Sequence, residues 1–173
     1  VPSIVFGLFG SAFFCIYLGL GFSILAGGLT LSCMLLPFFI QIVEEALRNI
    51  PQELKKSTAA LNLSNSGKLL NIFLPSILPS IIVALILSVG RALSETAALL
   101  FTSGYVTRMP SSLLDSGRTL SVHIYDLAMN VPGGEQAAYS TSFVLLMLLL
   151  LINIATVFLA SLWGKKQRGI NVS

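Results

Sequence analysis

Long apolar runs with almost no charged residues limit what this chain can fold into more than any other feature. Four such runs, residues 4–20, 22–43, 77–101 and 138–162, approach the roughly 20 residues that a helix needs to cross a bilayer. We therefore predict an all-α, polytopic transmembrane helical bundle with about four spans. The join at Gly19 and Gly21, between the first two runs, also leaves a re-entrant turn open.

The composition excludes several other classes of protein. Only 10% of the 173 residues are charged, whereas about one-quarter are charged in a typical soluble domain. The mean hydropathy is +0.90. Together these values argue against a disordered chain, a nucleic-acid-binding module and an ordinary cytosolic enzyme.

The basic residues of the loops predict the orientation of the chain. Segment 44–71 and the C-terminal tail are rich in Lys and Arg, whereas segment 102–136 balances two Arg against three acidic residues. Cytoplasmic loops carry the excess of Lys and Arg, and two spans separate the two basic regions. We expect a multi-pass protein of the cell (inner or plasma) membrane with a cytoplasmic C-terminus and an extracytoplasmic loop at 102–137. The pI near 9.1 then reflects membrane topology, and no nucleic-acid partner is expected.

The cytoplasmic segment has helix signals of its own. Asn49 can cap a helix that starts near Pro51 and runs through residues 52–61. Asn62 suits a left-handed C-terminal cap, and a second short helix is expected from residue 64 or 65 to just before Pro75. A loop with this much order predicts docking on a partner. The alternative is an amphipathic hairpin on the lipid surface.

Arg91 and Glu95 are the only charged residues inside any predicted span. Four residues apart in a helix, they share one face. A charge at the centre of the bilayer costs about 2.5–3.5 kcal/mol on insertion scales, so such residues usually face a pathway or a partner. We predict a substrate pathway at this pair. The alternative is a self-neutralising pair that holds helices together.

Other chemistries lack the residues that they need. Residues 62–69 nearly match the phosphate-binding pattern GxxxxGK[ST], but Asn62 replaces the first Gly and Leu69 replaces the final Ser or Thr. A serine nucleophile needs a nearby base, and the single His123 lies in a polar loop without a GxSxG motif. Cys15 and Cys33 form no CxxC pair, so we expect neither a disulfide nor a metal. No catalytic residue and no cofactor are predicted, and ATP hydrolysis is not expected of this chain.

The loop that ends in Leu74-Pro75 resembles the cytoplasmic signature loop of ABC importer permeases, written EAA…G…LP. Counting back from the LP places the signature Gly at Asn62 and the EAA at Lys56-Ser57-Thr58. The resemblance implies that the ATPase-coupling residues are Lys56, Ser57, Thr58, Ala59, Ala60, Leu61, Asn62, Leu63 and Ser64. Lys56 and Asn62 depart from the acidic residue and the Gly of the pattern.

Four further stretches are similar to the phosphate-importer permease family known as PstA. They are VPSIVFGLF at 1–9, EEALRNIP at 44–51, GRALSETAALLFTSG at 90–104 and LSVHIY at 120–125. The corresponding family patterns are VPSIVxGLF, EEALRxVP, RAxGETAPLLFTxG and LPVQIY. The similarity extends over nearly the whole chain.

This resemblance implies a type-I ABC importer permease (MetI-like) fold of six helices. Residues 1–173 would be one transmembrane domain, with 44–75 as its ATPase-coupling loop. Because the chain starts at an apolar Val1 without Met, we expect the first helices to be absent. The implied partners are a homologous permease (PstC-like), a dimer of ATP-binding subunits (PstB-like), an extracytoplasmic phosphate-binding protein (PstS-like) and membrane lipid.

The implied function is that of a transport subunit, not an enzyme. It would form the translocation path of an ATP-driven inorganic phosphate importer, with ATP hydrolysed by the separate subunit. One alternative is a permease for another oxyanion such as sulfate or molybdate. A secondary transporter or a structural membrane subunit is a further alternative, although no internal repeat of the kind common in secondary transporters is evident.

Overall fold

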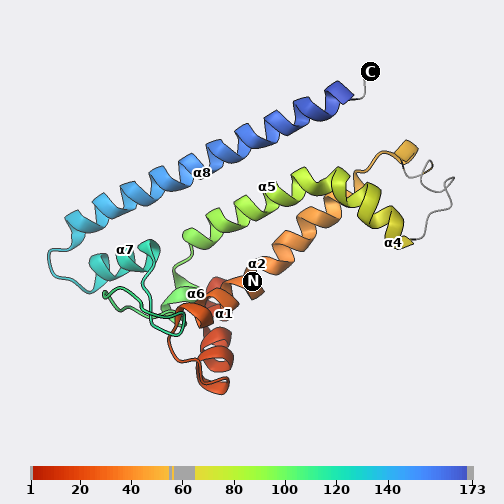
Figure 1. The fold of residues 1–173 in the computed structure, drawn as a ribbon. Helices are drawn as coiled ribbons and strands as arrows, with labels where there is room; N and C mark the ends of the chain where they lie inside the picture. Colours follow the sequence, from red (N-terminus) through yellow and green to blue (C-terminus); the bar gives the residue numbers. More distant parts are fainter. Residues whose placement is uncertain (1, 55, 57–64, 171–173) are drawn as a thin grey trace. The chain divides into compact units, whose positions relative to one another are not determined.

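The computed structural model describes residues 2–54, 56 and 65–170, with side chains except at 65 and 159–170. The regular structure of these residues is entirely helical, which confirms the all-α prediction. Its elements are α1 (Ser3–Gly10), the π-helix η1 (Ser11–Tyr17), α2 (Ile24–Arg48), α4 (Asn65–Lys68), the π-helix η2 (Leu69–Phe73), α5 (Leu74–Leu93), α6 (Ala97–Leu100), α7 (Leu120–Met129) and α8 (Glu135–Ile170) (Figure 1).

Three of the described helical segments are long and apolar enough to cross a membrane. They are Ile24–Arg48, Ser66–Leu93 and Glu135–Phe158, of 25, 28 and 24 residues. The first predicted span is shorter, because Ser3–Tyr17 extends about 22 Å at 1.5 Å per residue, against a bilayer core of about 30 Å. Gly19 (φ 69°) and Gly21 (φ 60°) then turn the chain in a conformation that suits glycine. The short helix and tight turn fit the re-entrant alternative better than a full span.

The second cytoplasmic helix does not end before Pro75, so that prediction is wrong. Residues Ser66–Leu93 form one helical segment that contains both Pro75 and Pro79. The π-turn η2 lies directly before Pro75. Its wider i→i+5 hydrogen-bonding pattern relaxes the helix at the point where the proline lacks an N–H.

The third predicted span also ends earlier than its apolar run. Helix α5 stops at Leu93, and α6 begins only at Ala97. Within the break, Ser94 Oγ donates to the carbonyl of Arg91 (2.9 Å) and the Glu95 N–H donates to the carbonyl of Ala92 (3.2 Å). The predicted span at 77–101 is therefore two helices separated by a polar turn.

The chain divides into two compact units. One consists of Val1–Pro37 with Val89–Ile152, and the other of Phe38–Ser88 with Asn153–Ser173. The long helices α2, α5 and α8 each run from one unit into the other. The residues that line the candidate site all belong to the first unit.

Glycines allow the elements of the first unit to pack closely. A Cβ atom added at Gly10 would lie 2.1 Å from Thr30 Oγ1, and one at Gly27 would lie 3.0 Å from Leu99 Cδ2. A Cβ at Gly7 would lie 3.0 Å from the Cα of Ala98. These contacts join α1, α2 and α6, which lie together in Figure 1. Small residues at these positions thus let the helices approach closely.

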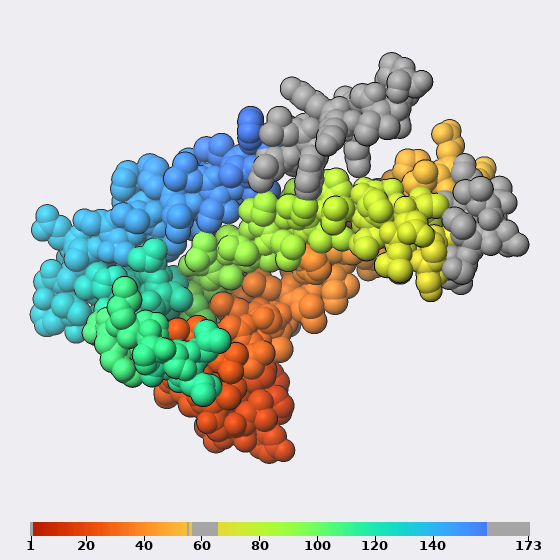
Figure 2. Space-filling view, in the orientation of Figure 1, coloured from red at the N-terminus to blue at the C-terminus, as the bar shows by residue number. Residues whose placement is uncertain are grey.

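The loop between α6 and α7 is fixed to the start of α2. The N–H groups of Ile24 and Leu25 donate to the carbonyls of Asp115 and Leu113, both at 2.9 Å. Ser23 caps the helix by accepting from the Ala26 N–H at 3.1 Å. In Figure 2 the green to teal atoms of this loop lie against the red and orange atoms of the N-terminal segment. The first orphan donors of α2 are thus satisfied by a loop some 90 residues away in sequence (Ile24 to Asp115).

Candidate functional site

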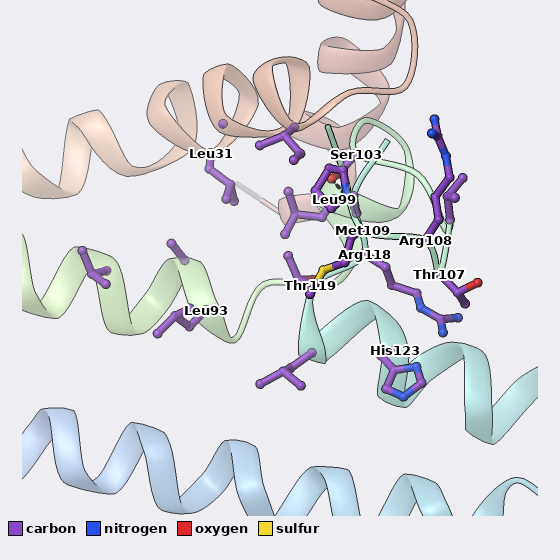
Figure 3. A pocket seen from close by; sticks show the side chains of 18 residues that line it. Leu31, Leu93, Leu99, Ser103, Thr107, Arg108, Met109, Arg118, Thr119 and His123 are labelled. Carbon is purple, nitrogen blue, oxygen red and sulfur yellow. Dashed lines mark hydrogen bonds between the residues drawn. The ribbon is translucent and has the colours of Figure 1, made fainter. Parts of the chain in front are cut away.

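A pocket of about 610 Å³ lies in the first unit, where the ends of several helices meet (Figure 3). Helix α2 contributes one wall, the last turn of α5 a second, and the 102–119 loop with the start of α7 the rest. The volume is within the range of small-molecule sites in proteins, about 300–1,000 Å³. The lining residues are Ile24, Gly28, Leu31, Val89, Ala92, Leu93, Leu99, Ser103, Val106, Thr107, Arg108, Met109, Pro110, Gly117, Arg118, Thr119, Leu120 and His123.

The ionisable side chains of the pocket wall are all basic. Arg108, Arg118 and His123 line it, and none of the described residues that line it is an Asp or a Glu. Thr107 and Thr119 add hydroxyl groups to the same wall. The remaining lining is largely aliphatic. This combination of fixed donors and an apolar surround suits an anion, or an anion attached to an apolar group.

Arg118 is held in place by Asp126 of α7. The Arg118 Nη1 donates to Asp126 Oδ2, and the two side chains are only 13% and 19% exposed. Asp126 also accepts from Asn130 Nδ2 at 2.8 Å. Asp126 does not line the pocket, so its carboxylate orients the guanidinium of Arg118 from the side away from the pocket. The other N–H groups of Arg118 are left for a ligand.

Arg108 lies at the exposed rim and pairs with Asp115 at 3.0 Å. Asp115 also accepts from the backbone N–H and the hydroxyl of Ser111, at 2.8 and 2.7 Å. These hydrogen bonds from Ser111, followed by the nearby Arg108 charge, hold the pKa of Asp115 below its ordinary value. The carboxylate therefore organises the loop segment that carries Arg108.

His123 is placed in the pocket wall by α7. This helix is capped at Thr119, whose Oγ1 accepts from the Val122 N–H at 3.4 Å. The Nδ1 atom of His123 is buried and has no hydrogen-bond partner among the described residues. Sequence reasoning considered His123 only as a base for a serine nucleophile and missed its neighbours. The available signal was the spacing of Arg118, His123 and Asp126 across the start of one helix.

Of the predicted pathway pair Arg91 and Glu95, only Arg91 lies in α5. Arg91 lies on the last turn of α5 and is exposed, whereas Glu95 is half-buried in the break after the helix. The expectation of two residues on one helical face is wrong, because α5 ends at Leu93. The carbonyl of Glu95 instead accepts from Ser121 Oγ of α7 at 2.7 Å. Neither residue lines the pocket, so their pathway role stays a prediction.

The predicted coupling residues fall mostly outside the described part of the chain. Lys56 is helical and exposed, following a helical stretch at 52–54. Residues 57–64, from Ser57 to Ser64, lie outside the described residues together with the predicted bend at Asn62. The coupling assignment therefore also stays a prediction.

Membrane-length helices joined by ordered polar loops define this chain as a polytopic helical membrane protein. Residues 1–169 match the family model described as "Binding-protein-dependent transport system inner membrane component". The chain belongs to this family, which consists of permease subunits rather than enzymes and has the predicted MetI-like fold.

Individual relatives cover nearly all of the chain. It is 34% identical to "Probable ABC transporter permease protein YqgI" of Bacillus subtilis, over 96% of this chain and 62% of the relative. It is 37% identical to "Phosphate transport system permease protein PstA homolog" of Mycoplasma genitalium, over 94% of this chain and 26% of the relative. Identity to "Phosphate transport system permease protein PstC" of Xylella fastidiosa is 33%, over 83% of this chain and 43% of the relative. The chain thus spans less than two-thirds of these relatives, and no solved structure matches it.

Proposed function

We propose that this chain is a permease subunit of an ATP-driven importer of inorganic phosphate, in which it forms part of the translocation path. The observation that carries the proposal is the 37% identity, over 94% of the chain, to a protein named as a phosphate transport system permease. Relatives named PstA 2 from Mycobacterium bovis (31% identical) and PstC from Xylella fastidiosa (33% identical) add to it.

The proposed partners follow from the same relatives. Similarity to both PstA and PstC proteins supports pairing with a homologous, PstC-like permease. The family description names dependence on a binding protein, which supports an extracytoplasmic, PstS-like phosphate-binding subunit. A dimer of PstB-like ATPase subunits would supply the energy, since the chain carries no complete phosphate-binding loop.

The proposed orientation puts segment 44–75 and the C-terminus in the cytoplasm. Lys and Arg are concentrated in both regions, and two of the membrane-length helices, Ser66–Leu93 and Glu135–Phe158, separate them. The 102–119 loop and α7 then lie on the extracytoplasmic side. In this orientation ATP binding would close the ATPase dimer, and residues 56–64 would transmit that motion to the helices.

Arg91 is the residue that we propose for the anion path. It lies at the end of α5, next to Ala92 and Leu93 of the pocket wall. Arginine stays charged in proteins and offers paired donors to phosphate oxygens. Glu95, in the break that follows, would keep the local charge near neutral and the phosphate site weak enough for release.

The decisive experiment is transport by the reconstituted complex of the full-length permease, its partner permease, the ATPase and the binding protein. Proteoliposomes are loaded with ATP and supplied with labelled phosphate or labelled sulfate outside. We expect ATP-dependent uptake of phosphate in large excess over sulfate. Preferential uptake of sulfate or molybdate would assign the other oxyanion. ATP-independent uptake driven by an ion gradient would instead favour a secondary transporter.

A further inference from the structure

We propose that the pocket between α2, the 102–119 loop and α7 binds a phosphate group, with Arg118, Thr107 and His123 as its donors. Nothing in the relatives' names assigns a site here, and Arg91 does not line this pocket. The inference rests on the proposed function only for the source of the phosphate group. The same chemistry is offered by free inorganic phosphate and by the headgroup of an anionic phospholipid.

The first argument is the state of Arg118. Its bond to Asp126 occupies Nη1, and Nε and Nη2 have no protein acceptor among the described residues. In Figure 3 its side chain extends toward the part of the pocket where Thr107 and His123 lie. A guanidinium that is already oriented loses little conformational freedom when it binds an oxyanion.

The second argument is the buried Nδ1 atom of His123. His123 lines the pocket, and its Nδ1 atom is buried beside it without a hydrogen-bond partner among the described residues. Buried polar atoms almost always have a hydrogen-bond partner. A buried atom without one in the protein is therefore a candidate to bind a ligand. Because Nδ1 is buried, a rotation of the imidazole ring must bring it to the pocket, where its N–H would donate to an oxyanion and complete the set of donors.

The third argument is the charge and shape of the site. The two carboxylates nearby, Asp115 and Asp126, bind Arg108 and Arg118 from outside the lining, so an anion in the pocket meets donors first. Their presence also moderates the positive potential, which predicts weak and reversible binding. The aliphatic wall formed by Leu31, Leu93 and Leu120 leaves room for the apolar part of a lipid.

Gly28 allows the pocket to be blocked without altering any charge. It lines the pocket, and a Cβ atom added there would meet nothing within 4 Å. Gly28→Leu therefore fills the pocket from the α2 side while its donors keep their partners. Arg118→Gln removes the main donor but leaves Asp126 unpaired, so the two variants test the site by independent means.

The test uses the full-length protein in its complex, in dodecyl maltoside without phosphate or lipid added. Histidine labelled with 13C is introduced into this subunit alone, and the His123 signal is assigned by its loss in His123→Gln. Inorganic phosphate is titrated at constant pH and ionic strength, with chloride as the control anion. A second titration uses phosphatidylglycerol in place of inorganic phosphate.

We expect a saturable shift of the His123 signal with at least one of the two probes, weakened about tenfold or more in both Gly28→Leu and Arg118→Gln. Arg48→Gln, which alters an exposed Arg–Glu pair outside the lining, should bind as the wild type does. A shift with inorganic phosphate assigns the free ion, and a shift with phosphatidylglycerol alone assigns the lipid. No shift with either probe, or an unchanged shift in both blocking variants, would overturn the site. Phosphate uptake by the same complex tests the proposed function separately.

Discussion

The backbone of Gly10 lies directly against the side chain of Thr30, so that a Cβ atom at Gly10 would come within 2.1 Å of Thr30 Oγ1. Thr30 is fully buried, and its hydroxyl already donates to the carbonyl of Ala26 at 2.8 Å. The side chain therefore cannot move aside without losing this bond. The contact fixes the separation of the short N-terminal helix from α2.

Gly10→Ala should destabilise the protein by about 1–3 kcal/mol, the usual cost of overpacking a tight contact. The measurement is thermal unfolding of the purified protein in detergent. Gly28→Ala is the matched control, because a Cβ there meets nothing within 4 Å. Equal melting temperatures for Gly10→Ala and the wild type would show that this contact is not tight.

Ser121 connects α7 to the break after α5 through its bond to the carbonyl of Glu95. Ser121 is buried, so Ser121→Ala leaves that carbonyl without this donor and should cost about 1–2 kcal/mol. Faster amide hydrogen exchange in residues 94–97 would report loosening of the break. Ser32→Ala is the control, because the exposed Ser32 hydroxyl donates to the carbonyl of Gly28 within its own helix. Unchanged exchange in Ser121→Ala would contradict a role for this bond in holding the break.

The lowered pKa of Asp115 predicts that the order of the 102–119 loop depends on pH in the acid range. Its pKa is lowered in the folded protein, chiefly by the two hydrogen bonds from Ser111. A carboxylate of this kind stabilises the fold above its unfolded pKa, and the contribution is lost as the pH falls through its lower folded value. We therefore expect the loop to loosen only below the ordinary pKa of 3.8.

Pepsin cleavage of the loop between pH 5 and pH 2, normalised to an unfolded substrate, measures this loosening. The wild type should show a step of increased cleavage below pH 3.8. Asp115→Asn should be cleaved faster at every pH and show no step, because its side chain cannot titrate. A step that persists in Asp115→Asn would assign the acid sensitivity to another group.

Hydropathy predicts the long helices well but not where they break. Three of the four predicted spans overlap membrane-length helices, because burial in lipid leaves a direct signature in composition. Within the apolar run at 77–101, the polar residues Ser94-Glu95-Thr96 mark the place where α5 stops at Leu93, but Ala97 to Leu100 resume the apolar character and conceal the break from a hydropathy average. The rule that a helix ends before a proline also failed at Pro75, because the π-helix η2 accommodates the missing N–H.

The candidate site was harder to predict than the fold, because it depends on contacts between distant segments. Asp115 and Ile24 are brought together by a backbone hydrogen bond that no local pattern encodes. His123 reaches the pocket wall only because Thr119 starts α7 where it does. The basic residues of this loop are visible in the sequence, but there they predict only the membrane topology and not a pocket.

Ala60 lies in the predicted coupling segment, outside the described residues. Ala60→Asp should break docking of the ATPase, since a desolvated, unpaired carboxylate in a protein interface is costly. We expect loss of ATPase co-purification and of ATP-driven uptake, with normal insertion into the membrane. Glu53→Asp, a conservative change upstream in the same loop, serves as the control. Unchanged co-purification and uptake in Ala60→Asp would show that the coupling assignment is wrong.

Arg91 should be essential for uptake, whereas Glu95 should modulate it. Arg91→Gln removes a fixed charge and its planar pair of donors, so uptake per assembled complex should fall at least about tenfold. Arg91→Lys should retain part of the activity, because the lysine ammonium keeps the positive charge but lacks the paired N–H donors of the guanidinium. Since Glu95 lies beyond the end of α5, Glu95→Gln should alter turnover more mildly, or trap phosphate by deepening its binding.

The amount of assembled complex separates this pathway role from a purely structural one. If Arg91 only holds helices together, Arg91→Gln should lower the yield of complex while each assembled complex transports normally. If Arg91 contacts the anion, the yield should be preserved and the uptake per complex lost. Quantifying the complex by size-exclusion chromatography, with labelled phosphate uptake measured on the same preparation, gives both values. Near-normal uptake per complex in Arg91→Gln would rule out the pathway role and leave Arg91 as a packing residue at the end of α5.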